Sequence, residues 1–166
     1  MEKQIVRPAQ LADVHILADV KLRHVRSLYR GMLSAAYLKS LNEATYLPQL
    51  QQWLEAGEQV DVLEKDGEAV AFIAYGADPA DSGYGLIHEA GMLPVCTLAD
   101  AELLVCSCKQ HLAERYPVVR VMTPKDNFRT RFLYEQQGFR PDGYQTTVSV
   151  DGNEFWLMRM IGGTCE

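Results

Sequence analysis

The stretch 127–143 carries several reactive or hydrogen-bonding side chains at regular spacing. Asn127, Arg131 and Tyr134 recur at four- and three-residue steps, so they share one face of a predicted helix. An amide, a guanidinium and a phenol on one face can bind a polar ligand, and the phenol can also donate a proton. Gly138 stands where a helix needs a left-handed final residue. The stretch therefore predicts a helix, a glycine stop and a strand, in that order.

The residue pattern of this stretch also resembles that of a known family. An Asn followed by Arg-x-x-Tyr-Glu-x-x-Gly-Phe-Arg-Pro resembles the C-terminal signature of the GNAT superfamily of acyl-CoA-dependent N-acetyltransferases. The segments 5–9 and 29–33 resemble the opening of many members, so the likeness covers most of the chain. It implies one α/β (α+β) domain with a mixed, mostly antiparallel sheet flanked by helices. We expect this domain over 1–161 and a C-terminal tail over 162–166.

The resemblance also implies two catalytic residues. Transfer of an acyl group from a thioester to an amine needs a neutral amine and a proton for the departing thiolate. Tyr134 stands where the family commonly keeps a tyrosine that protonates the sulfur, although a tyrosine packed between helix and sheet is the structural alternative. For the base, the family points to the strand before Pro94, and we choose Glu89 over His88. The alternative is that one of these two is exposed and the other is hydrogen-bonded in the sheet.

Further contacts follow from the same resemblance. It implies acetyl-CoA as the cosubstrate, and an acceptor that is a primary amine of a small molecule or peptide. Arg26 and Tyr29 could contact the acceptor, with a solvated helix end as the alternative. An asparagine in this position binds the pantetheine arm in the family, but it also suits a helix cap. The coenzyme-binding residues that we expect are Met92, Leu93, Asn127 and Arg131.

The turn after Pro94 departs from the family pattern. In the family this turn begins with Gln or Arg, followed by any two residues, Gly, any one residue, and then Gly or Ala. The backbone amides of the turn cradle a pyrophosphate. Here Asp100 and Glu102 hold the glycine positions. A carboxylate near a phosphate costs on the order of 4 kcal/mol at ~4 Å and an effective dielectric of ~20. Thr97-x-x-Asp100 instead predicts a capping box.

This departure counts against acetyl-CoA binding and keeps a second function open. The alternative is a catalytically inactive GNAT-like domain that binds another ligand or a protein partner. For the enzyme, Lys125, Arg129 and Arg131 could offer positive charge to the phosphates from a neighbouring loop.

Composition narrows the remaining classes. A length of 166 residues with 48% hydrophobic and 23% charged residues is typical of one globular domain. The net charge of −6 argues against nucleic-acid binding. We expect a cytoplasmic protein because no segment has the length and apolarity of a signal or membrane span. The four cysteines have neither disulfide nor zinc-ligand spacing, so no metal is expected. A homodimer is the candidate assembly.

Hydrophobic periodicity and turn residues place the elements. Asp66-Gly67 and Asp151-Gly152 predict two-residue hairpin turns, and 77–83 reads as a polar loop. The predicted helices are 11–29, 35–41, 47–54, 98–115 and 127–137. The predicted strands are 4–7, 60–64, 69–75, 84–93, 118–122, 145–150 and 155–161.

Overall fold

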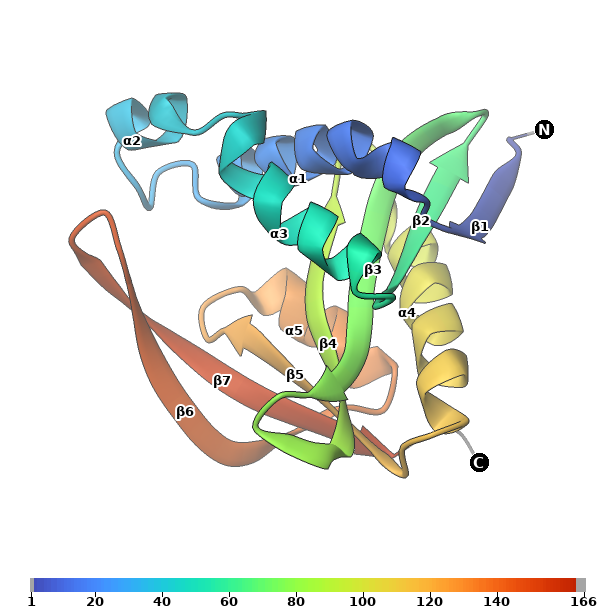
Figure 1. Cartoon of the computed structure of the whole chain (residues 1–166). Coiled ribbons are helices and arrows are strands. Elements are labelled where there is room, and N and C mark those ends of the chain that lie inside the picture. The colour runs from blue at the N-terminus through green and yellow to red at the C-terminus, as the bar shows by residue number, and fades with distance from the viewer. Residues whose placement is uncertain (1, 164–166) are drawn as a thin grey trace. The chain divides into compact units, whose positions relative to one another are not determined.

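The computed structural model describes residues 2–163, which form a seven-stranded sheet with helices (Figure 1). The strand order is β1-β2-β3-β4-β5-β7-β6. Strands β4 and β5 are parallel, whereas β1 with β2, β5 with β7, and β6 with β7 are antiparallel. The predicted fold class, α/β with a mostly antiparallel sheet, is confirmed.

The elements have the following bounds. The helices are α1 (Val14–Leu28), α2 (Ala35–Ser40), α3 (Glu43–Glu55), α4 (Leu98–Ala113) and α5 (Phe128–Gln136), with a 3-10 turn at Leu11–Asp13. The strands are β1 (Gln4–Pro8), β2 (Gln59–Lys65), β3 (Glu68–Asp78), β4 (Asp81–Met92), β5 (Val118–Pro124), β6 (Arg140–Val150) and β7 (Asn153–Gly163).

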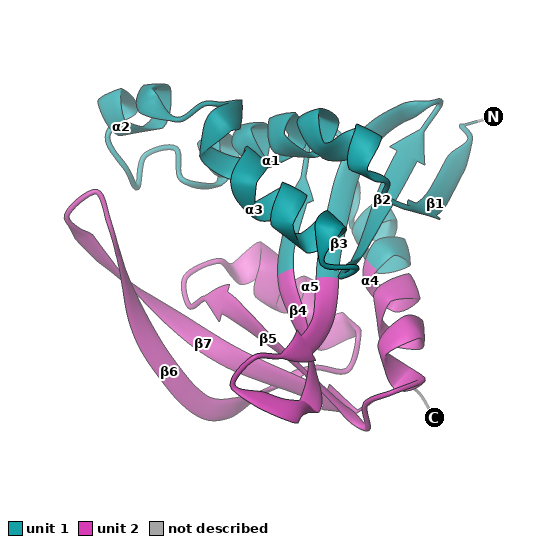
Figure 2. Ribbon diagram, in the orientation of Figure 1, with its two compact units in different colours: residues 1–74, 89–104 teal, residues 75–88, 105–166 magenta. Residues whose placement is uncertain are grey.

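The chain divides into two compact units (Figure 2). Unit 1 comprises residues 1–74 and 89–104, and unit 2 comprises 75–88 and 105–166. Three elements, β3, β4 and α4, have residues in both units. Strand β7 includes Gly162 and Gly163, the first two residues of the expected tail, while 164–166, including Cys165, lie outside the described residues.

The core of unit 1 follows from the apolar face of α1. This helix buries Val14, Leu17, Ala18, Val20, Leu22 and Val25, and it packs against α3, where Leu50 is buried. The middle of β3 is apolar on both faces and fully buried over 71–74, as expected for a central strand. Gly91 on β4 has no room for a side chain, because a Cβ there would lie 2.5 Å from Cε1 of Phe72.

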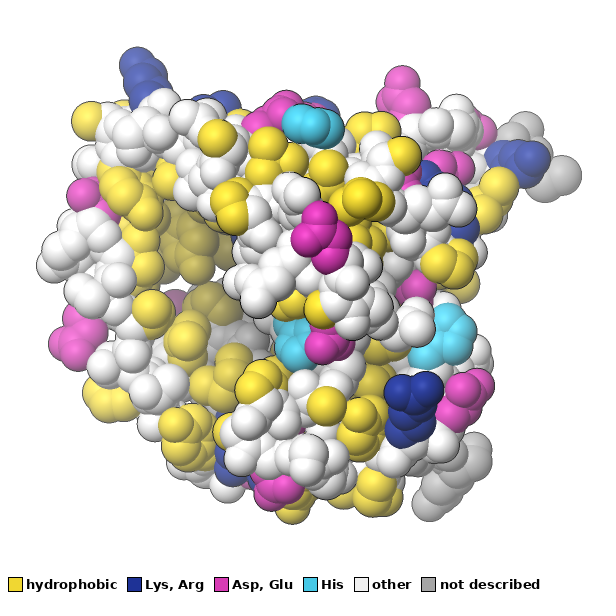
Figure 3. Space-filling view, viewed as in Figure 1, with side chains coloured by type: hydrophobic (Ala, Val, Ile, Leu, Met, Phe, Trp, Pro, Cys, Tyr) yellow, Lys and Arg dark blue, Asp and Glu magenta, His cyan; other side chains and the backbone are white. Residues whose placement is uncertain are grey.

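Unit 2 has its core around α5 and the strands β5 and β7. Leu133, Phe139 and Met160 are buried there, and Gly162 lets the ring of Phe139 approach the backbone of β7. The β6–β7 hairpin has an exposed outer part, where Figure 3 shows hydrophobic side chains at the surface. The large exposed residues of this hairpin are Tyr144, Val148 and Trp156.

Most predicted elements are present, with three corrections. The two Asp-Gly turns are confirmed, since Asp66 and Asp151 both have φ of 52° and the following glycines also have positive φ. The prediction of a loop over 77–83 is wrong, because β3 extends as far as Asp78 and β4 begins at Asp81. Strand β6 begins at Arg140 rather than Gln145. Helix α3 begins at Glu43, because Asn42 and Thr45 form a capping box there.

Candidate functional site

The side chain of Glu89 on β4 forms an ion pair with Lys21 of α1 within unit 1. The two side chains are 24% and 14% exposed, so neither charge is fully solvated. The Nζ atom of Lys21 also lies 6.0 Å from the ring centroid of Tyr46 on α3. Glu89, the predicted base, therefore has an ammonium group as its neighbour.

Two tyrosines of unit 1, Tyr29 and Tyr46, interact electrostatically with Glu89. Burial and the charge of Glu89 raise the pKa of Tyr29 above its ordinary value. Burial raises the pKa of Tyr46 to about 12, with contributions from Tyr37, Glu89 and Tyr29. These tyrosines remain protonated at neutral pH and can donate hydrogen bonds. Tyr29, predicted from the sequence to contact the acceptor, thus lies within electrostatic reach of Glu89.

Arg26, the other predicted acceptor contact, supports the backbone around α2. Its Nε atom donates to the carbonyl oxygen of Leu38 at 3.2 Å, and its Nη2 atom donates to that of Leu41 at 2.7 Å. The guanidinium thereby satisfies carbonyl groups at the C-terminal end of a short helix. A role of Arg26 in acceptor binding stays a prediction.

Met92 ends β4 and Leu93 follows it, and the amides of both residues already have partners in unit 1. The N–H of Met92 donates to Nδ1 of His24 at 3.3 Å, and the N–H of Leu93 donates to the carbonyl oxygen of Val70 at 2.9 Å. Burial and the nearby Lys21 lower the pKa of His24 to about 4, so its ring is neutral at neutral pH. In this arrangement neither amide is available to a ligand, and the coenzyme contacts of both residues stay predictions.

The N-terminus of α4 has the predicted capping box. The N–H of Asp100 donates to Oγ1 of Thr97 at 3.1 Å, and the N–H of Thr97 donates to Oδ2 of Asp100 at 2.9 Å. Asp100 is 1% exposed, and its carboxylate also accepts from Nζ of Lys65 at 3.0 Å and from the side chain of Gln4. The carboxylate is thus satisfied by donors from β1, from β2 and from the turn.

Electrostatics keep Asp100 ionised. Burial by itself raises the pKa of this carboxyl group, but hydrogen bonds from the Thr97 amide and from Lys65 outweigh burial, so the pKa lies below its usual range. Asp100 and then Glu2 raise the pKa of Lys65. The start of α4 therefore contains a carboxylate of its own chain, where the resembled family has glycine.

In unit 2, the predicted acid Tyr134 is buried, with 3% of its surface exposed. Its ring meets that of Phe139 edge-on, with the centroids 5.5 Å apart. The N–H of Phe139 donates to the carbonyl oxygen of Tyr134 at 3.0 Å, and Gly138 has the predicted positive φ, of 89°. Burial, followed by the neighbouring Cys108, raises the pKa of Tyr134. This phenol holds its proton throughout the neutral pH range.

The start of α5 contains polar atoms that suit a ligand. Asn127 caps the helix, because its Oδ1 accepts from the N–H of Thr130 at 3.2 Å. Within residues 2–163 no hydrogen bond uses the Nδ2 group of Asn127, so the same side chain can cap and donate to a ligand. Oγ1 of Thr123 and Nε of Arg131 are buried, and neither has a hydrogen-bond partner among the described residues. Nη1 of Arg131 donates to the carbonyl oxygen of Lys125 at 2.9 Å.

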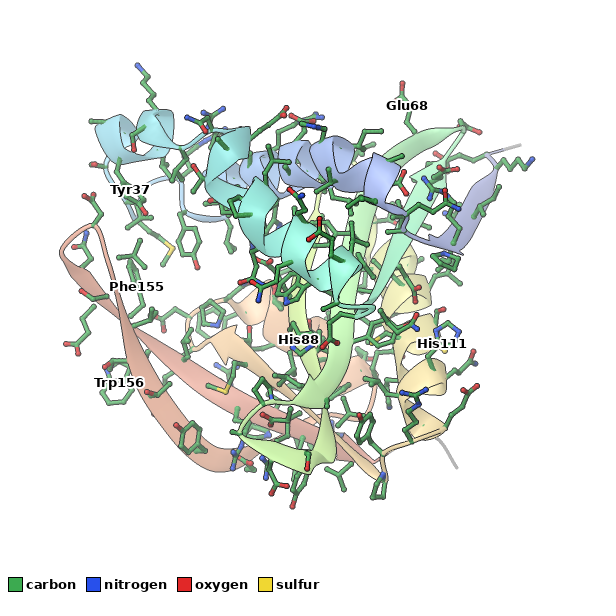
Figure 4. The ribbon with its side chains drawn as sticks, viewed as in Figure 1. Tyr37, Glu68, His88, His111, Phe155 and Trp156 are labelled. Atoms are coloured by element: carbon green, nitrogen blue, oxygen red, sulfur yellow. The ribbon has the colours of Figure 1, made fainter. Side chains whose placement is uncertain are left out.

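The structure assigns the predicted residues to two groups. Unit 1 contains Glu89 and Tyr29, which interact electrostatically, together with Arg26, Met92 and Leu93. Unit 2 contains Tyr134, Asn127, Arg131 and the alternative base His88, which Figure 4 labels on β4. Lys21, Tyr46 and His24 were missed by sequence reasoning. The one sequence signal was that Lys21 and His24 belong to the predicted helix that ends at Tyr29.

In the described part of the chain, no group of three or more His, Cys, Asp or Glu side chains could hold a metal ion. Over the same residues, no helix has both the length and the apolarity needed to cross a membrane.

Comparison with solved structures finds the same fold in N-acetyltransferases. A ribosomal-protein-alanine N-acetyltransferase from Brucella melitensis is 17% identical, with a TM-score of 0.76 over 96% of this chain and 99% of that one. PaiA N-acetyltransferase from Thermoplasma acidophilum, solved in complex with coenzyme A, is 14% identical, with a TM-score of 0.72 over 97% and 99%. An acetyltransferase of the GNAT family from Streptococcus pneumoniae is 12% identical, with a TM-score of 0.69 over 98% and 100%. No family model and no curated protein sequence matches the chain.

Proposed function

We propose that this chain, which has the fold of the GNAT N-acetyltransferases, transfers an acetyl group from acetyl-CoA to a primary amine of a small molecule or peptide. The observation that carries the proposal is the half-buried carboxylate of Glu89, which pairs with an ammonium group and interacts electrostatically with Tyr29 and Tyr46. A carboxylate in such surroundings can take a proton from an amine that is about to react. Cytoplasmic location and a homodimer remain predictions.

The segment from β5 to α5 fits the coenzyme. Its unused donors and acceptors, Nδ2 of Asn127, Oγ1 of Thr123 and Nε of Arg131, are atoms for which a bound polar molecule would supply partners. Lys125 and Arg129 are exposed nearby in sequence and add positive charge for phosphate groups. We infer that these residues hold acetyl-CoA, which supplies an activated acetyl thioester when bound.

The start of α4 does not fit the pyrophosphate. The amides of Thr97 and Asp100 already donate within the capping box, and the buried carboxylate of Asp100 is an anion in its own right. A phosphate at this turn would lose those two donors and meet a like charge. In place of the amides at the start of α4, the sequence offers the phosphate groups the positively charged side chains near the start of α5.

The two predicted catalytic residues then have separate roles. Glu89, which pairs with Lys21 in the structure, accepts the proton of the acceptor amine. Tyr134 keeps its proton at neutral pH, which is the state a general acid needs before it donates to a departing thiolate.

A thiol-release assay with a panel of primary amines tests the proposal. The parent protein should release coenzyme A thiol in the presence of at least one amine, and Glu89→Gln should lower that rate roughly 10²-fold, the size expected for loss of a general base. Glu68→Gln is the matched control, since Glu68 is an exposed carboxylate at the start of β3 (Figure 4) and should leave the rate unchanged. Equal rates for the parent and Glu89→Gln would exclude Glu89 as the base.

A further inference from the structure

The carboxylate of Glu89 is already paired with an ammonium group from its own chain. Lys21 reaches it from α1 and keeps 14% of its side chain exposed, against 24% for Glu89. Surface ion pairs are weak because water and salt screen them, and burial of this extent reduces that screening. The pair is thus a specific contact of unit 1 rather than two solvated charges.

Lys21 also has an aromatic neighbour of the kind that binds alkylammonium ions. The ring of Tyr46 lies 6.0 Å from Nζ, at the outer limit of a cation–π contact. Tyr29 interacts electrostatically with Glu89, and Tyr37 does so with Tyr46. A carboxylate with aromatic faces beside it recognises a primary ammonium by charge and by its alkyl stem.

We propose that the ammonium group of Lys21 occupies the position of the acceptor amine, and that a primary alkylammonium ligand binds at Glu89 by displacing it. Lys21 is then a specificity-determining residue. Its four-carbon stem has many rotamers, so the side chain can leave without movement of α1. The identity of Glu89 as the base rests on the proposed function, but the ammonium site itself requires no transfer reaction.

The competition has a measurable consequence. A ligand must replace an ion pair that forms within the chain, so simple amines bind weakly to the parent protein and need further contacts to succeed. Removal of the Lys21 charge leaves the carboxylate of Glu89 without this partner. The variant should therefore bind a simple ammonium more tightly than the parent does.

The test is an NMR titration of the full chain with n-butylammonium chloride, followed at the backbone amides of Glu89 and Ala90. Lys21→Met keeps the length and apolar stem of the side chain, and it should lower Kd at least about tenfold, equivalent to about 1.4 kcal/mol. Lys39→Met is the matched control, since Lys39 is exposed on α2 and should leave Kd unchanged. The double variant Lys21→Met with Glu89→Gln should lose the gain.

Two results would overturn the inference. One is the same Kd for the parent and for Lys21→Met. The other is an equal gain for the neutral probe 1-butanol, which would indicate an opened apolar space rather than an ammonium site. Thermal melts confirm folding, and Lys21→Gln serves the same comparison if the Met variant does not fold. Because no thioester is present, the outcome is independent of whether acetyl transfer occurs.

Discussion

At the residue scale, the surroundings of Tyr134 restrict how it can act. It is buried on α5 against Phe139, and burial raises its pKa, so it stays protonated through the neutral range. Tyr134→Phe keeps the ring and its packing while it removes only the hydroxyl group. We expect turnover to fall roughly 10²-fold with nearly unchanged affinity for acetyl-CoA. Steady-state kinetics and a binding titration measure the two quantities separately.

A matched control for this substitution is Phe139→Leu, which disturbs the same ring contact and retains the phenol. It should lower the melting temperature and leave turnover per folded molecule within a small factor. Unchanged turnover in Tyr134→Phe would assign the residue to packing alone, which was the structural alternative.

Individual site residues were predictable where a local pattern defines them. The capping box of Thr97 and Asp100 was expected from a three-residue spacing, and the structure contains it. The donors Gln4 and Lys65, which complete the environment of Asp100, were not expected, because they belong to strands more than thirty residues away. Such pairing depends on tertiary arrangement, which no local spacing encodes.

At the element scale, the ionised Asp100 should stabilise the start of α4 in a pH-dependent way. Its folded-state pKa lies below the ordinary value, so its stabilisation is present above pH ~4 and is lost as pH falls through the folded pKa. Asp100→Asn should reduce the free energy of unfolding at pH 7 by at least about 1 kcal/mol, because it removes the charge from the hydrogen bonds that Lys65 and the Thr97 amide donate to this side chain. The difference from the parent should shrink in acid.

Urea denaturation at pH 7 and at pH 3 measures this difference. Glu102→Gln is the control, because it removes a carboxylate from the same first turns of α4 and should change stability by no more than ~0.5 kcal/mol. If the Asp100→Asn deficit were the same at both pH values, the carboxylate charge would not be the source of the stabilisation.

Turn chemistry and periodicity explain which elements were predictable. The hairpin turns at Asp66 and Asp151 need positive φ at both central residues, a rule that Asp-Gly satisfies, and both were predicted correctly. The run 77–83 has the polar composition that is typical of a loop, yet strands occupy most of it. Backbone pairing within the sheet outweighs the low strand propensity of the residues at the start of β4.

At the scale of the whole molecule, the two units share three elements. Because β3, β4 and α4 each have residues in both, neither unit can unfold without disrupting an element that continues into the other. We therefore expect one cooperative transition in urea. The chain has two tryptophans, Trp53 on α3 in unit 1 and Trp156 on β7 in unit 2.

The single-tryptophan variants Trp53→Phe and Trp156→Phe let fluorescence report on one unit at a time. Each fluorescence curve should coincide with the far-UV circular dichroism curve of the same variant. A fluorescence midpoint that clearly precedes the dichroism midpoint in either variant would show that the units unfold separately.

The fold as a whole was predictable because one C-terminal pattern and the order of elements resembled a single superfamily. Solved structures of 12% to 17% identity share it over nearly the full chain. The acceptor could not be predicted in the same way. Its chemistry depends on side chains such as Lys21 and Tyr46, which lie together only after α1, α3 and β4 have packed.

Isothermal titration with acetyl-CoA tests the central claim most directly, because the departure at Asp100 and Glu102 concerns the coenzyme itself. The account predicts a micromolar Kd, supported by the polar groups at the start of α5. It also predicts that Asn127→Ser, which keeps a capping oxygen and removes the Nδ2 donor, weakens binding about tenfold. No heat at millimolar acetyl-CoA with the folded parent protein would contradict the account and favour the alternative, an inactive domain of the same fold that binds another ligand.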